Sequence, residues 1–255
     1  MLFDSHAHYN DERFDDDRFE ILNSMQENGI EYIVNAADSI ESVEKILPLS
    51  EKYPFIYAAV GVHPEEAEGL TEADMDRLKE FSQLEKVCAI GEIGLDYHYD
   101  DVEKSVQKKW FDRQLSLAEE VNLPVIIHDR DAHGDCIEIL ARHDIKRTGG
   151  VMHCYSGSAE MAKELMPMGM YFGFGGTLTF KNAKKVRAAA EAIPLERIVL
   201  ETDCPYLAPE QVRGQRNSSL FMHYVAEKLA EIKGLSVKEI ERITTENAKK
   251  LYKIP

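Results

Sequence analysis

Apolar residues gather in eight short runs along the chain, and many of the segments between them show the 3.6-residue spacing of amphipathic helices. A short apolar run bounded by polar residues predicts a buried strand, whereas apolar positions three and four residues apart predict a helix with one buried face. The predicted strands are residues 2–8, 30–37, 55–62, 87–93, 123–128, 149–154, 170–174 and 197–202. The predicted helices include residues 16–28, 40–53, 72–81, 102–121 and 181–192.

A strand followed by a helix recurs along the chain, which predicts β/α units and a parallel sheet. Eight strands are the number that a closed (β/α)8 TIM barrel requires. No linker or change of composition divides the sequence, so we expect one TIM-barrel domain over residues 1–255. Two further helices follow the eighth strand, the second opened by a capping box at Ser236 and Glu239. We expect both to pack against the outside of the barrel.

The overall charge restricts the partners of the protein. With 46 acidic and 30 basic residues, the formal net charge is −16, which disfavours a nonspecific surface for polyanions, so any nucleic acid must be held locally. The 4 cysteines form no CxxC pair and fall in or near predicted core elements, as expected of a reducing compartment. No basic and apolar leader opens the sequence, and no apolar stretch is long enough to cross a bilayer. We therefore expect a cytoplasmic protein with no membrane partner.

Side chains of the kind that bind metals stand at the downstream ends of six of the predicted strands. A barrel brings the carboxyl ends of distant strands together, and its active site lies there. Imidazole nitrogen combined with carboxylate oxygen suits Zn²⁺, Mn²⁺ or Mg²⁺. The sequence therefore predicts a metal site built from distant parts of the chain, with the candidates His6, His8, His63, Glu92, His128, His153 and Asp203.

The first strand carries two of these histidines. His6 and His8 are two residues apart, so on a strand both side chains project to the same face and can bind one ion. Asp4 shares this face and is expected to orient a histidine from behind. An isolated pair of this kind is as often a solvated strand end, and the other five candidates favour the metal.

The remaining strand ends are expected to complete two ion sites. Glu92 ends an apolar strand, where a buried carboxylate requires a compensating cation, and a ligand shared by two ions is its natural role. His128 and His153 end the next two strands and would complete the second ion. Asp203 is expected to ligate one ion and to accept a proton from water. Glu201 precedes Asp203 by two residues and projects to the same face of the strand. It is the alternative proton acceptor, or else it supports a ligand without contacting the ion.

The substrate contacts are predicted from the surrounding loops. We favour His63 as a contact to a substrate phosphate or water over a purely structural histidine. Arg130, two residues after a candidate ligand, is the preferred phosphate contact. Arg213, Arg216 and Lys181 are further candidates for a positive edge, although charged loops are usually only solvated.

Other positions near the strand ends are assigned packing or surface roles. Two strands carry no candidate ligand and end in small residues at 34–37 and 173–176, which either make room for substrate or serve packing. Asn217 is expected to cap the helix that follows it. Cys204 has no partner that would activate a thiolate, so packing is its expected role. Surface or core positions are expected for the remaining histidines, His98, His133, His143 and His223.

The strings FDSHAHYN, GVHP, GEIGLDY, IIHDRDAH, MHCYSG and LETDCPYLAP, in this order and spacing, closely resemble the TatD family of metal-dependent deoxyribonucleases. The resemblance runs nearly from end to end, includes the closing TTENAKKLY segment, and implies a TIM barrel with two divalent ions. It implies His6, His8, Glu92 and Asp203 around one ion and Glu92, His128 and His153 around the other. One departure is RGQRNSS at 213–219, where members commonly read RGKRNEP. This departure weakens any inherited substrate contact there, and we expect it to leave the metal site untouched.

The resemblance implies hydrolysis of DNA phosphodiester bonds by a water activated between two divalent ions, with DNA single-strand ends as the substrate. The ligands themselves predict only a metal-dependent hydrolase. An amidohydrolase-type enzyme acting on a small amide, lactone, ester or aminoacyl ester would use the same residues. A non-catalytic metal-binding protein is disfavoured, because structural zinc ligands are usually close together in sequence.

Overall fold

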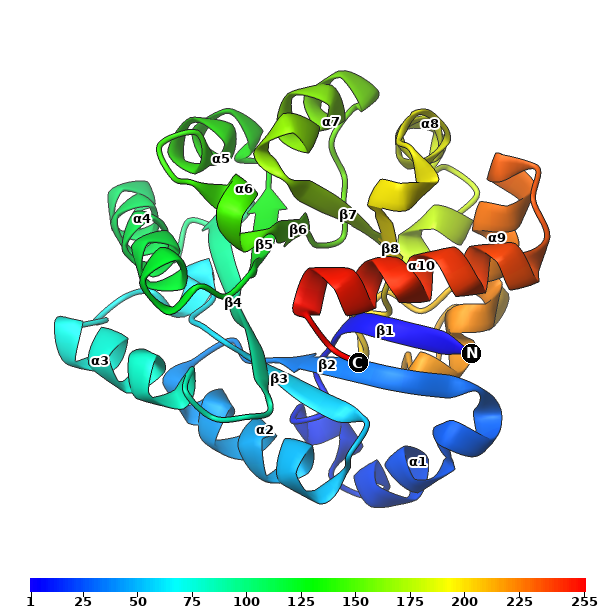
Figure 1. The fold of residues 1–255 in the computed structure, drawn as a ribbon, viewed down its shortest axis with the longest axis horizontal. Coiled ribbons are helices and arrows are strands. Elements are labelled where there is room, and N and C mark those ends of the chain that lie inside the picture. Colours follow the sequence, from blue (N-terminus) through cyan, green and yellow to red (C-terminus); the bar gives the residue numbers. More distant parts are fainter.

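The computed structural model describes residues 1–255, and its eight strands form one parallel sheet in the order β1 to β8. Figure 1 shows the strands curling around a common centre with helices outside them. The apolar runs form strands because parallel strands are buried on both faces, and every residue of β4 is buried. The strands are β1 Leu2–Ala7, β2 Ile30–Ala36, β3 Ile56–Val60, β4 Val87–Asp96, β5 Val125–Arg130, β6 Gly150–Met152, β7 Met170–Phe174 and β8 Ile198–Leu200.

The ring of strands closes between β1 and the segment that follows β8. Ala7 and Cys204 form a parallel bridge, and the backbone N–H of His8 donates to Cys204 O at 2.8 Å. The backbone N–H of Asp203 donates to His6 O at 2.9 Å. These bonds join the first and last strands, so the predicted (β/α)8 barrel is confirmed.

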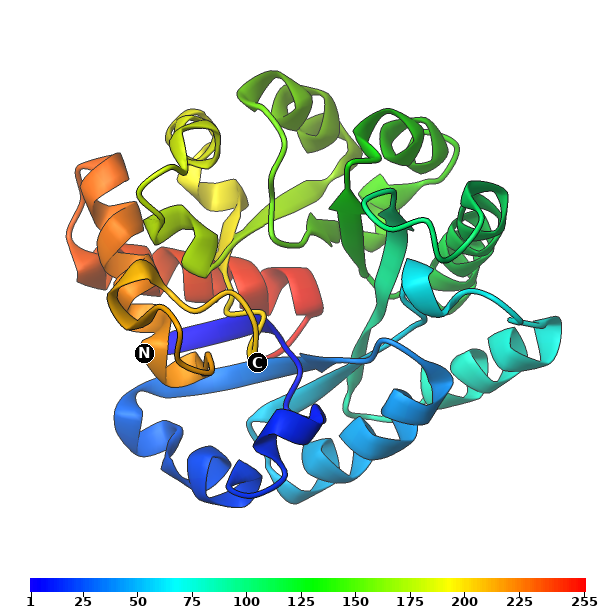
Figure 2. The same ribbon diagram turned by 180° about the vertical axis from the view of Figure 1, so that it is seen from behind.

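Helices follow the strands around the outside of the barrel, as Figures 1 and 2 show from opposite sides. The predicted helix over 16–28 is interrupted, because α1 ends at Ser24 and a short 3₁₀ turn then leads to Gly29 in a left-handed conformation. None of the helices is both long enough and apolar enough to cross a membrane. The helices are α1 Arg18–Ser24, α2 Ile40–Lys52, α3 Glu72–Phe81, α4 Lys104–Val121, α5 His133–Leu140, α6 Ile145–Thr148, α7 Ala159–Leu165, α8 Lys184–Ala192, α9 Met222–Lys233 and α10 Val237–Tyr252.

The last helix departs from the predicted outer position. The capping box that opens α10 is present, with the backbone N–H groups of Glu239 and Ser236 donating to each other's side chains at 3.3 and 3.0 Å. However, α10 lies across the starts of the strands, in red in Figure 1, and joins the core inside the barrel through Leu251 and Tyr252. The Tyr252 hydroxyl also donates to Ser5 O at 2.9 Å. Because α10 closes the amino-terminal end of the barrel, only the carboxyl ends of the strands remain open for a site.

The four cysteines are all free thiols, and three of them are buried. This agrees with the expectation that they pack as small apolar residues rather than as bridges. Burial raises the pKa of the Cys204 thiol to about 12, so it stays protonated near neutral pH.

Candidate metal centre at the carboxyl ends of the strands

Glu92 stands at the centre of the predicted ligands, buried on β4. Its two oxygens face different histidines. Oε2 lies 3.1 Å from His6 Nε2 and 3.5 Å from His8 Nε2. Oε1 lies 2.7 Å from His128 Nδ1 and 3.6 Å from His153 Nε2. One carboxylate therefore connects two groups of histidines from opposite sides.

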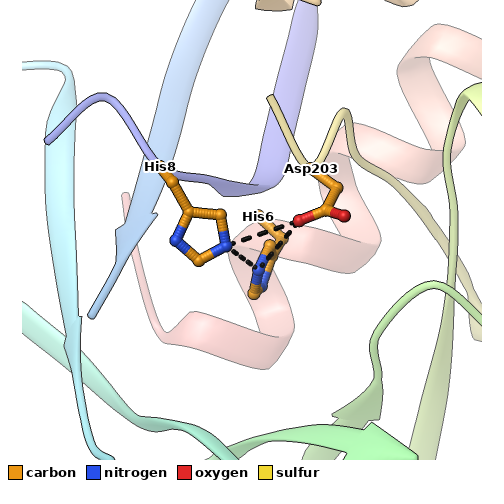
Figure 3. Close-up of side chains that lie close together, drawn as sticks. All are labelled: His6, His8 and Asp203. Carbon is orange, nitrogen blue, oxygen red and sulfur yellow. Dashed lines mark hydrogen bonds and ion pairs between the residues drawn. The ribbon is translucent and has the colours of Figure 1, made fainter. Parts of the chain in front are cut away.

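The first group consists of His6, His8 and Asp203 (Figure 3). Alternation along β1 places both imidazoles on the inner face, with their Nε2 atoms 2.9 Å apart. Asp203 Oδ1 lies 3.6 Å from His6 Nε2 and 3.4 Å from His8 Nε2. The backbone of Asp203 is left-handed, with φ 58°, and its N–H is held by His6 O, which brings this residue beside the end of β1.

Each imidazole has one nitrogen that faces the clustered ligand atoms and an outer nitrogen that faces away from them. The hydrogen-bond partner of the outer nitrogen determines which of the two carries the proton. His8 Nδ1 lies 3.0 Å from Ala36 O and donates to it, because a carbonyl can only accept. His153 Nδ1 lies 3.2 Å from Glu201 Oε1, although without the alignment of a hydrogen bond. In the neutral form both rings therefore keep the proton on Nδ1 and present the Nε2 lone pair to the centre.

Glu201 lies behind His153 and does not line the cavity described below. Its side chain is buried, and Oε1 accepts the backbone N–H of Cys154 at 2.6 Å. Gly173 of β7 makes room for it, since a Cβ at this position would stand 2.1 Å from Glu201 Oε2. The small residues at the end of β7 thus serve packing, and neither 34–37 nor 173–176 lines the cavity described below.

Asp96 is a residue that the sequence analysis missed. His128 Nε2 donates to Asp96 Oδ2 at 2.9 Å, which leaves Nδ1 facing Glu92. The position of Asp96 in the sequence could have indicated this role. Asp96 follows Glu92 by four residues, so both side chains project to the same face if the strand continues that far. In the structure β4 does continue, three residues beyond its predicted end. Gly94 permits this extension. It has φ 150°, and a Cβ here would lie 1.9 Å from His128 O. The glycine therefore allows β4 and β5 to approach closely where their side chains converge.

His63 lies beside Glu92 and His128, at the edge of the second group of histidines. Its Nε2 lies 3.8 Å from Glu92 Oε1, and its ring meets that of His128 edge-on at 4.2 Å. Its Nδ1 accepts the backbone N–H of Glu65 at 3.2 Å. Burial and the charge of His128 lower the pKa of His63 to about 3, so the neutral ring carries its proton on Nε2. His63 thus presents a donor to the centre, whereas the other histidines can present lone pairs.

The predicted positive edge is mostly wrong. Arg130 does line the cavity, with Nη1 4.0 Å from Asp96 Oδ2. Arg213 and Lys181 instead form ion pairs with Glu210, and Arg216 pairs with Asp17. These three cations line no part of the cavity, because carboxylates on neighbouring loops hold them.

The 213–219 segment also differs from its predicted roles. Asn217 caps no helix, because its side-chain amide is buried and donates to Thr202 O at 2.8 Å, while Ser218 caps the following turn. The Ser219 hydroxyl donates to Asp4 Oδ2 at 2.6 Å, and Asp4 Oδ1 accepts the Thr202 N–H at 2.9 Å. Asp4 therefore ties β1 to the segment after β8 rather than orienting a histidine ring. Ser219 thus contacts β1, the strand that carries His6, through Asp4. That the departure leaves the metal site untouched stays a prediction.

Charge around the centre keeps the carboxylates ionised. Burial alone would raise the pKa of Glu92, but the charges of His153 and His6 and the hydrogen bond from His128 hold it well below its usual value. The pKa of Asp203 is also lowered, because the charge of His153 and the hydrogen bond from His8 outweigh burial. The centre is therefore rich in negative charge that only cations or protons compensate.

A cavity of about 440 Å³ opens over this centre. Seven of its fifteen lining residues are aspartate or glutamate, and only one is an arginine. The lining includes four of the candidate histidines, His8, His63, His128 and His153, together with Glu92 and Asp203. A small substrate can therefore reach the clustered ligand atoms from solvent.

The donor set fits bound metal ions. Two atoms that bind one ion at about 2.0–2.2 Å stand roughly 3 to 3.5 Å apart. The separations among His6, His8, Glu92 and Asp203 run from 2.9 to 3.6 Å, close to this range. Lone pairs and carboxylates brought this close repel one another unless a proton or a cation lies among them.

The barrel and this open cluster of imidazoles and carboxylates define the class of the protein as a metal-dependent hydrolase. A family model described as "TatD related DNase" matches residues 3–253. The chain is 48% identical over 254 residues to the "Uncharacterized metal-dependent hydrolase YabD" of Bacillus subtilis, covering 100% of both chains. It is 34% identical to YcfH of Escherichia coli, which bears the same description, over 100% of this chain and 96% of that one.

Solved structures agree with the sequence comparisons. The crystal structure of YjjV, described as a TatD homolog from Escherichia coli, superposes with a TM-score of 0.93 at 34% identity, covering 100% of this chain and 98% of that one. An organophosphorus hydrolase from Deinococcus radiodurans shares the fold alone, with a TM-score of 0.64 at 14% identity. The chain belongs to the TatD family.

Proposed function

We propose that this protein hydrolyses phosphodiester bonds at the ends of DNA strands with two divalent metal ions. The observation that carries the two-ion proposal is the position of Glu92, whose two oxygens face two separate groups of histidines. The DNA substrate rests on the family description. The acidic lining also supports a strand end rather than a long duplex, because it offers no basic groove to a polyanion.

The ligand sets follow from these contacts. His6, His8, Glu92 and Asp203 would hold one ion, and Glu92, His128 and His153 would hold the other. When bound, such ions lower the pKa of water and neutralise charge on the phosphate. They are Zn²⁺, Mn²⁺ or Mg²⁺, since imidazole and carboxylate together accept all three.

The chain's own side chains divide the remaining work. Asp203 is ionised and opens on the cavity, so it accepts the proton of the attacking water. His63 donates its Nε2–H to a phosphate oxygen, since its Nδ1 is already engaged as an acceptor. Arg130 balances phosphate charge from the rim, where its side chain is partly exposed.

The direct test is a time course on end-labelled single- and double-stranded DNA with Mg²⁺, Mn²⁺ or Zn²⁺. We expect the wild type to shorten single-stranded DNA progressively from one end. The Glu92→Ala variant should lose this activity. Glu227→Ala, which alters an exposed glutamate on α9, is the matched control and retains activity. DNA left intact under every metal would refute the proposal.

A second candidate is an amidohydrolase-type reaction on a small amide, lactone, ester or aminoacyl ester. The cavity lining favours it, because Arg130 is the only lysine or arginine there and a neutral substrate needs no positive edge. The same metal-loaded preparations are therefore screened against these substrates. Turnover of one of them, with DNA untouched, would replace the nuclease proposal.

A further inference from the structure

Two exposed tyrosines line the cavity from opposite sides. Tyr206 follows β8 and Tyr99 follows β4, and these strands lie half a turn apart in the ring of eight. The two side chains are 44% and 46% exposed, and they are the only apolar residues in the lining. Large exposed rings cost hydration free energy, so a pair of them at one cavity indicates a surface for a ligand.

Tyr206 is held in one orientation beside the predicted ligands. Its backbone N–H donates to Asp203 O at 2.9 Å, and its hydroxyl donates to Asp11 Oδ2 at 2.9 Å. Its ring meets the His8 imidazole edge-on, with 6.2 Å between the ring centroids. The Arg13 guanidinium lies over one face of the ring at 4.0 Å and is itself fixed by Asp11. A ring fixed at its edge, its hydroxyl and one face loses little freedom when a flat group stacks on it.

Tyr99 is arranged in a similar way. The Arg130 guanidinium lies over its ring at 5.0 Å, and the His98 ring meets it edge-on at 4.8 Å. Arg130 also approaches Asp96, which holds the His128 ring. Each tyrosine is therefore connected to the metal centre through a neighbouring side chain.

We propose that Tyr206 and Tyr99 are platforms on which the nucleobases flanking the scissile phosphate stack. This inference rests on the proposed function and names what holds the strand end. The cavity has one arginine against seven carboxylates, so phosphate contacts alone bind a strand poorly there. Base stacking on aromatic rings carries no charge and tolerates any sequence.

The test compares a short single-stranded oligonucleotide with a matched one whose two terminal nucleotides at each end are abasic. For the wild type, we expect a KM that is about 5- to 100-fold higher for the abasic substrate. In the Tyr206→Leu, Tyr99→Leu double variant, the ratio of the two KM values falls toward one. Tyr206→Phe, which keeps the ring, retains the ratio. Phe19→Leu is the control, because Phe19 is 49% exposed under Lys52 but lines no part of the cavity.

Equilibrium binding separates this inference from the proposed function. Fluorescence anisotropy with phosphorothioate versions of both oligonucleotides measures base-dependent affinity without cleavage. If no DNA is cleaved but the base dependence of binding disappears in the double variant, the platforms are supported and the nuclease proposal fails. If DNA is cleaved but the double variant keeps the wild-type ratio in both assays, the platforms are overturned and the nuclease proposal stands. A wild-type ratio of one also overturns them.

Discussion

The histidines around Glu92 differ in the partner that each outer nitrogen meets. A main-chain carbonyl fixes His8, while the carboxylates of Glu201 and Asp96 stand behind His153 and His128. Such partners set the ring orientation and raise the basicity of the inner nitrogen. The orientation of these rings thus depends on side chains and backbone atoms that are not themselves predicted ligands.

Asp96 provides the first prediction at this scale. Asp96→Asn keeps the shape of the side chain but removes the charge behind His128, so the affinity of the ion that His128 binds should fall about 10- to 100-fold. Competition with a chromogenic chelator measures this change. Asp101→Asn, an exposed position a few residues further along, is the control. Equal affinity in the two variants would show that Asp96 only packs.

Proton release on metal binding is the second prediction. Without a bound cation, burial lowers the pKa of His128, but hydrogen bonds to Asp96 and Glu92 outweigh it and raise the pKa to about 9. Burial is likewise outweighed at His153, where the charges of Glu201, Glu92 and Asp203 raise the pKa to about 10. At pH 7 both rings are therefore protonated, and only deprotonated rings bind a metal.

Burial is also outweighed at His8, where hydrogen bonds to Asp203 and Glu92 raise the pKa well above its usual value. Metal binding at pH 7 should accordingly release about three protons from these three rings, and affinity should rise with pH until the rings have lost their protons. Calorimetric titration in buffers of different ionisation enthalpy counts the protons. Binding without proton release would mean that these rings are neutral beforehand or are not ligands.

At the scale of elements, some of the clustered side chains lie on the strands and others on the segments that follow them. β4 extends to Asp96, whereas β6 and β8 end at Met152 and Leu200. His153 and Asp203 therefore lie on the segments that leave the short strands and turn over the barrel. The approach of β4 to β5 then brings Glu92 and His128 together.

Gly94→Ala tests this approach. The added methyl group would lie 1.9 Å from His128 O, at a backbone φ of 150°, so β4 and β5 must separate. We expect a loss of roughly 3 kcal/mol or more in the free energy of unfolding, measured with urea. Gly134→Ala is the matched control, because that exposed helical glycine has open space around it and should be neutral or slightly stabilising. Equal stabilities would refute the close packing of the two strands.

At the scale of the whole molecule, the order of strands and helices could be predicted from sequence because each element carries its own periodicity. The predicted strands 170–174 and 30–37 match β7 and β2 to within one residue. The position of α10 could not be predicted, because an apolar helical stripe does not specify the surface that it covers. Here that surface is the open end of the barrel, which Leu251 and Tyr252 fill.

The part of the candidate site that could be predicted is the part that the barrel topology alone brings together. Strand ends converge in any barrel, so the six candidate ligands and His63 come together as expected. The arginines were misjudged, because a sequence shows a charge without its partner, and Glu210 and Asp17 hold three of the four candidate cations. Asp96 was missed because it lies beyond the predicted end of its strand.

The central claim is that hydrolysis depends on ions held around Glu92. The most direct measurement determines metal content per chain and hydrolytic rate on the same preparations of wild type and Glu92→Ala, with Glu227→Ala as the control. We expect two ions per chain in the wild type and the control, and loss of both metal and hydrolysis in Glu92→Ala. Hydrolysis that persists in Glu92→Ala after its metal is lost would contradict the account.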